Sequence, residues 1–128
     1  MKTLIRFVAS ACLFAALVAC SSTPSMSDLD SADYGPRPTD AQVAEGIRAL
    51  GGNAAAARAA SGGESGYRLS TGWATDLDNP GSYIYGWQVR FQQDASQGGG
   101  TVTALFHDGV LIAATRETAS QAAPVRLK

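Results

Sequence analysis

The stretch from Tyr85 to Gln92 constrains the fold more than any other part of this sequence. Apolar side chains alternate in it with small or polar ones, which predicts a strand with one wholly apolar side. Because large aromatic side chains contribute strongly when they are buried, we expect this side to dominate the core. The apolar side consists of Tyr85, Trp87, Val89 and Phe91, and the other side of Gly86, Gln88, Arg90 and Gln92.

A hairpin is predicted where Asp108-Gly109 separates two apolar runs, residues 101–107 and 110–116. Asp-Gly is a preferred sequence for a two-residue turn between antiparallel strands. Both sides of these strands are fairly apolar, so we expect at least one of them to lie centrally in a sheet. The expected cross-strand pairs are Phe106 with Leu111, Ala104 with Ala113, and Val102 with Thr115.

Residues 67–73 alternate in the same way and predict a further strand that includes Trp73. The segments 76–82 and 94–100 are rich in turn-forming residues. We expect a turn at 76–82 rather than a calcium loop, because Trp87 stands where such a loop needs a bidentate glutamate. The glycines in 94–100 are not followed by the Lys and Ser/Thr of a phosphate-binding loop.

Two helices are predicted ahead of the sheet. Thr39 and Gln42 have the spacing of a capping box, and apolar residues follow them at helical intervals. Asn53 stands where it would cap a second, short helix through the alanine-rich residues 54–60. The expected fold is therefore α+β, with one or two N-terminal helices packed on a small antiparallel sheet of about four strands.

The first twenty residues have the pattern of an export signal. Lys2 and Arg6 precede a short apolar run that ends at Ala19. The run is shorter than the roughly 20 apolar residues that a membrane-spanning helix needs. Residues 17–20, Leu-Val-Ala-Cys, resemble the bacterial lipobox, in which the cysteine is lipidated and the preceding segment is removed. The resemblance implies a lipid on Cys20.

This interpretation divides the chain into four parts. They are a lipoprotein signal peptide (1–19), a lipidated flexible tether (20–33), a small α+β domain (34–118) and a disordered tail (119–128). The tether has few large apolar residues, so it cannot bury enough surface to offset the entropy cost of ordering. The serine after Cys20 resembles the serine found at this position in lipoproteins that are sorted to the outer membrane. The resemblance implies that the lipid attaches the protein to the outer membrane and that the protein faces the periplasm.

Composition excludes several classes of function. The chain has 10 Lys and Arg against 11 Asp and Glu, and the leader would remove Lys2 and Arg6. An acidic mature chain argues against a nucleic-acid partner. Cys12 lies in the leader and Cys20 would carry lipid, so we expect no disulfide, no cysteine nucleophile and no thiolate metal site. We expect no cofactor.

Candidate catalytic residues are few. Ser65 lies in a Gly-Glu-Ser-Gly sequence like that around a protease serine, but the chain is too short for the two barrels of that class. His107, the only histidine, is expected at the hairpin end. Asp76, Asp78 and Asp108 are better explained as turn formers. We therefore expect the protein not to be an enzyme.

Three short motifs resemble those of a group of small uncharacterised bacterial lipoproteins. They are Asp33-Tyr34-Gly35-x-x-Pro38, Tyr85-Gly86-Trp87 and the Asp108-Gly109 hairpin. The resemblance covers about residues 33–112 and implies an envelope compartment and an α+β fold. It implies no catalytic residue and no ligand.

The predicted function is a non-catalytic envelope lipoprotein that contacts another envelope protein. Trp73 and Tyr83 are the candidate contact residues, because Trp and Tyr are enriched in interface hot spots. One alternative is a periplasmic domain that binds a small ligand in a cleft between helix and sheet. A cell-wall hydrolase is a further alternative, and it would need a nucleophile–base pair or two convergent carboxylates.

Overall fold

The computed structural model describes residues 23–61, 66–120 and 123–128. The predicted signal peptide, Cys20 and Ser65 lie outside these residues. The chain divides into two compact units. Of the described residues, one unit contains those up to Ala32 together with Thr75–Tyr83, and the other contains those within Asp33–Ala74 and Ile84–Lys128.

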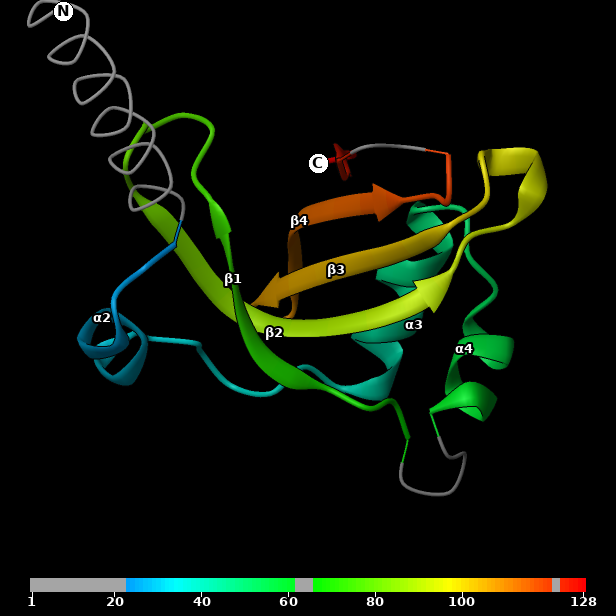
Figure 1. The fold of residues 1–128 in the computed structure, drawn as a ribbon. Helices are drawn as coiled ribbons and strands as arrows, with labels where there is room; N and C mark the ends of the chain where they lie inside the picture. The colour runs from blue at the N-terminus through cyan, green and yellow to red at the C-terminus, as the bar shows by residue number, and fades with distance from the viewer. Residues whose placement is uncertain (1–22, 62–65, 121–122) are drawn as a thin grey trace, which may run out of the picture. The chain divides into compact units, whose positions relative to one another are not determined.

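A five-stranded sheet forms the centre of the fold, with its strands in chain order (Figure 1). Each strand from β2 onward pairs antiparallel with the next. The predicted antiparallel sheet is confirmed, although it has five strands where about four were expected. The strands are β1 (Ser70–Thr75), β2 (Tyr83–Gln92), β3 (Thr101–His107), β4 (Val110–Glu117) and β5 (Val125–Arg126).

The extra strand, β5, lies in the segment predicted to be a disordered tail. Its residues pair with Thr115 and Arg116 of β4. The N–H of Leu127 donates to the carbonyl oxygen of Ala114 at 2.7 Å, and the Leu127 side chain packs against the core. The structure thus differs from the predicted disordered tail at residues 125–127, where an open strand edge and an apolar contact order the chain.

Two of the helices, α3 (Asp40–Ala49) and α4 (Ala54–Ala60), cover one face of the sheet (Figure 1). The capping box predicted for α3 is confirmed: the Thr39 hydroxyl accepts the Gln42 N–H, and the Gln42 side chain accepts the Thr39 N–H. Asn53 caps α4 by accepting the N–H of Ala56 at 3.0 Å. A short 3-10 turn, η1 (Ala95–Gln97), precedes β3.

A third helix, α2 (Met26–Ser31), lies within the segment predicted to be a flexible tether. Ser25 and Asp28 form a second capping box, which supplies partners for the first N–H groups of the helix. The helix buries none of its residues. This segment thus differs from the predicted flexible tether because local hydrogen bonds form a short helix, which does not pack against other residues.

The predicted apolar side of β2 faces the helices. Val89 and Phe91 are buried there, and Tyr85 and Trp87 are half-buried. The strand therefore contributes to the core as its alternation predicts. The buried core consists of Val43, Ile47, Ala54, Ala57, Tyr67, Val89, Phe91, Val102, Ala104, Phe106 and Ala114.

The β3–β4 hairpin has the predicted turn but only part of the predicted register. Asp108 and Gly109 both have positive φ, 51° and 77°, as the two-residue turn requires. Phe106 pairs with Leu111 as expected, but the register then shifts by one residue. Ala104 pairs with Ala114 rather than Ala113, and Val102 with Arg116 rather than Thr115.

A β-bulge at Ile112 causes this difference between the predicted and the observed register. The pairs on its two sides, Phe106 with Leu111 and Leu105 with Ala113, leave Ile112 without an opposing residue. An extra residue reverses the in–out alternation beyond it. Leu111 and Ala114, which are three residues apart, can therefore both pack on the core under the helices.

Candidate functional site

The three motifs of the resemblance lie together in the larger unit. The indole N–H of Trp87 donates to the Gly35 carbonyl oxygen at 2.9 Å, and the Tyr34 and Tyr85 rings meet edge to face with centroids 5.9 Å apart. Nδ1 of His107 lies 2.9 Å from the Tyr85 carbonyl oxygen. Because a carbonyl only accepts, Nδ1 carries the proton in this contact.

Arg37 completes this motif cluster. Its guanidinium lies 5.7 Å from the centre of the Trp87 ring and donates to the Tyr67 carbonyl oxygen at 3.2 Å. These contacts hold the chain that leads into α3 against β2 and against Tyr67, which precedes β1. The polar groups of the cluster therefore bind one another and the backbone, so their contacts stabilise the fold rather than form a binding site.

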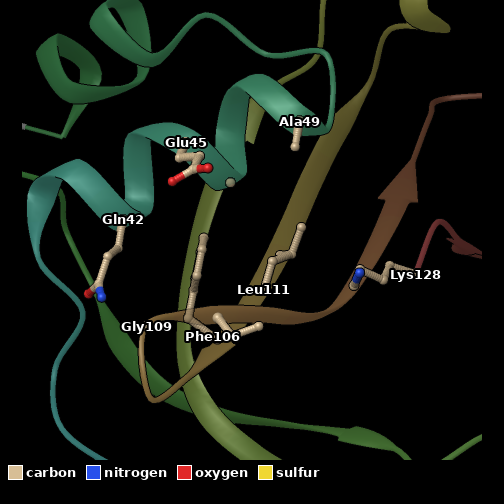
Figure 2. A pocket seen from close by; sticks show the side chains of 9 residues that line it. Gln42, Glu45, Ala49, Phe106, Gly109, Leu111 and Lys128 are labelled. Atoms are coloured by element: carbon tan, nitrogen blue, oxygen red, sulfur yellow. The ribbon is translucent and has the colours of Figure 1, made fainter.

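A groove between α3 and β4 is a stronger candidate for a functional site (Figure 2). It has a volume of about 360 Å³. We call it the α3–β4 groove. Its lining residues are Gln42, Glu45, Gly46, Ala49, Phe106, Gly109, Val110, Leu111 and Lys128.

Close contact between α3 and the sheet shapes one side of this groove. Gly46 faces the Phe106 ring, and a Cβ at Gly46 would lie 2.5 Å from two ring carbons. Only glycine lets the helix approach a buried aromatic ring so closely. Ala49, one turn further along, presents only a methyl group and leaves space above Leu111 (Figure 2).

The floor of the α3–β4 groove is apolar and its rim is charged. Val110 is 61% exposed beside the half-buried Leu111. Glu45 extends from α3, and Lys128 lies on the other side of the groove (Figure 2). Neither side chain forms an ion pair or hydrogen bond with another residue in the described part of the chain. The groove therefore combines apolar surface with one free charge of each sign.

The residues proposed from sequence as contact residues lie elsewhere. Trp73 is in β1 and Tyr83 begins β2. Both are half-buried, and each takes part in an interaction with another residue. The α3–β4 groove is lined by other residues. Two features of the sequence could have indicated it: Gly46, an isolated glycine within a helical pattern, and Val110, an apolar residue directly after the hairpin turn.

The other candidate residues serve as turn and hairpin residues. Oδ1 of Asp76 accepts the N–H of Asp78 at 3.0 Å, and Asp108 forms the hairpin turn. His107 ends β3, where its Nε2 lies 3.5 Å from an Asp108 carboxylate oxygen. Residues 23–61, 66–120 and 123–128 contain no group of three or more His, Cys, Asp and Glu side chains that could hold a metal ion.

None of the helices in the described residues is long and apolar enough to cross a membrane. In comparisons with known proteins, no protein family, curated protein or solved structure matches this chain.

Proposed function

We propose that this chain is a membrane-anchored bacterial envelope lipoprotein that acts without catalysis, through contact between its α+β domain and another envelope protein. The observation that carries the contact is the α3–β4 groove, with its exposed apolar floor and unpaired charges. The anchor rests on the sequence of the leader and on the cysteine at position 20. The outer membrane, facing the periplasm, is the proposed location.

The composition of the groove favours a protein segment as its occupant. Protein interfaces combine an apolar centre with a polar rim, and the exposed Val110 and half-buried Leu111 supply such a centre. Glu45 attracts a basic group, and Lys128 attracts an acidic one. The proposed partner therefore presents an apolar side chain to the floor, with a basic residue placed to reach Glu45.

Site-specific photo-crosslinking in intact cells tests this contact. A photoreactive phenylalanine replaces Val110, and the matched control replaces Ala55, which is exposed on α4 and does not line the groove. We expect one adduct of defined mass from position 110 and none from position 55. Glu45→Lys should reduce that adduct strongly, because it places like charges opposite each other.

Two results would contradict the proposed contact. One is an adduct pattern that is the same from both positions. The other is an adduct from position 110 that Glu45→Lys leaves unchanged.

A further inference from the structure

Part of the outer edge of β4 is open beside the α3–β4 groove. The strand β5 and the two residues after it cover only the far end of this edge. The last contact there is at Ala114, whose carbonyl oxygen accepts the N–H of Leu127 and whose N–H donates to the carbonyl oxygen of Lys128. In the described part of the chain, no strand pairs with this edge at residues 110–113. An open strand edge presents backbone groups that can pair with another chain.

The backbone N–H and C=O of Leu111 point outward at this open edge. His107 and Val110 flank the two-residue turn, so they form a hydrogen-bonded pair. The two kinds of pair alternate along an antiparallel ladder. The next pair, Phe106 with Leu111, is therefore not hydrogen-bonded, and the backbone groups of Leu111 point away from β3. No hydrogen bond from another described residue reaches them.

The bulge at Ile112 makes Leu111 equivalent to Ala114. Both side chains pack on the core under the helices. Both residues also direct their N–H and C=O to the outer edge, because the extra residue lies between them. At Ala114 these groups bond to the end of the chain, and at Leu111 they are open. A strand in line with β5 could therefore pair with Leu111 as the end of the chain pairs with Ala114.

We propose that an extended segment of the partner protein adds to this edge as a further antiparallel strand, paired with Leu111. This inference rests on the proposed function and specifies how the partner binds. Residues directly opposite each other in antiparallel strands have their side chains on the same face. The partner residue opposite Leu111 thus places its side chain in the α3–β4 groove (Figure 2). In strand addition, backbone hydrogen bonds give affinity and pockets for alternate side chains give specificity.

The charge on α3 indicates a second residue of the added strand. Glu45 lines the groove and forms no ion pair with another described residue. Side chains two positions apart on a strand share a face and lie about 6.8 Å apart along it. A basic residue two positions from the apolar one therefore lies on the face that Glu45 lines. The expected recognition sequence is an apolar residue and a Lys or Arg with one residue between them.

A synthetic peptide tests the strand addition. The probe is acetyl-TVTLTKT-amide, whose apolar and basic side chains alternate with threonines and so share one face. The full chain in zwitterionic nanodiscs receives the probe, and NMR follows the backbone signals. We expect saturable shifts at residues 45–49 and 109–113. The amide of Leu111 should exchange with solvent more slowly in the complex, because its N–H then donates to the probe.

Methylation of single peptide nitrogens separates strand pairing from other modes of binding. Methylation at the probe's leucine removes the N–H that would donate to the carbonyl oxygen of Leu111, and it places a methyl group between the strands. It should weaken binding about tenfold or more. Methylation at the threonine after this leucine is the matched control, because that N–H points away from β4. The control should bind within about twofold of the unmodified probe.

A pair of variants tests the charge. Glu45→Lys should weaken binding of the unmodified probe about threefold or more, because it places like charges together. Glu117→Lys makes the same change at an exposed β4 residue that does not line the groove and should bind normally.

Equal binding of the two methylated probes would overturn the strand addition, and so would an absence of saturable shifts. The proposed function fails differently. If the methylated probes bound equally while the adduct from position 110 still depended on Glu45, the partner contact would stand without strand pairing. If only the leucine-methylated probe bound weakly while position 110 gave no specific adduct in cells, the edge would accept a strand and the proposed partner contact would be contradicted.

Discussion

Gly46 is the residue at which the absence of a side chain sets the position of a whole helix. A Cβ there would lie 2.5 Å from Cε2 and Cζ of Phe106, a side chain that is only 1% exposed. The ring belongs to the core and cannot simply rotate away into solvent. The approach of α3 to the sheet, and with it one wall of the α3–β4 groove, therefore depends on this glycine.

The first prediction is that Gly46→Ala destabilises the protein. Alanine is favoured over glycine in a helix by about 0.8–1.0 kcal/mol, but overpacking a core costs about 1–3 kcal/mol. We expect a net decrease of up to about 2 kcal/mol in the free energy of unfolding, measured by urea denaturation. Adding Phe106→Leu should make the alanine substitution less costly, because the smaller side chain leaves room for the methyl group.

A gain in stability on Gly46→Ala in the unaltered background would contradict this account. It would mean that α3 can move away from Phe106 at little cost. The groove wall would then be less firmly fixed than the close contact implies.

Among the elements, the β3–β4 hairpin shows how one residue determines which side chains reach the core. Ile112 has no opposing residue, and regular pairing continues on both sides of it. Removing it would leave Leu111 next to Ala113, with their partners Phe106 and Leu105 already adjacent. The bulge can thus be deleted without changing any other cross-strand pair.

The second prediction is that the chain tolerates deletion of Ile112. We expect a loss of about 1–2 kcal/mol or less in the free energy of unfolding, from the missing half-buried side chain. Deletion of Thr103, within the regular part of β3, is the matched control and should prevent folding. That deletion reverses the faces of the residues on one side of it, so Val102 or Ala104 would leave the core.

Both deletions can be compared by chemical denaturation and by the dispersion of NMR signals. If deletion of Ile112 unfolds the chain as the Thr103 deletion does, the bulge itself is required. If both variants fold equally well, the register does not determine the core.

At the scale of the whole molecule, the proposed lipid on Cys20 would determine where the domain is held. An acyl chain contributes about 0.8 kcal/mol per buried CH₂ group to membrane attachment. The acidic balance of the mature chain gives little attraction to anionic headgroups. If Cys20 carries the proposed lipid, attachment should therefore depend on its acyl chains.

The third prediction is that Cys20→Ser moves the chain out of the membrane fraction. Cys12→Ser is the matched control, because Cys12 lies in the predicted leader and should have no effect. Cell fractionation gives the location, and mass spectrometry of the intact chain gives the processing and the lipid. A chain found in the cytosol with residues 1–19 still attached would contradict the lipoprotein interpretation.

The sequence by itself determined the features that depend on neighbours in the chain. The apolar side of β2 follows from alternation, the start of α3 from the Thr39–Gln42 spacing, and the hairpin turn from Asp108-Gly109. Each of these features depends on local backbone geometry and on the burial of side chains close together in the chain. A sequence pattern indicates both directly. The predicted α+β class follows from the same features.

The tertiary structure alone decided the bulge at Ile112, the pairing of β5 and the α3–β4 groove. The bulge places Leu111 and Ala114 together on a core that distant helices complete, and β5 requires an open edge of β4. The groove depends on Gly46 meeting Phe106, a residue far away in the chain. Such features have no local signature, because their free energy comes from contacts that only the folded chain makes.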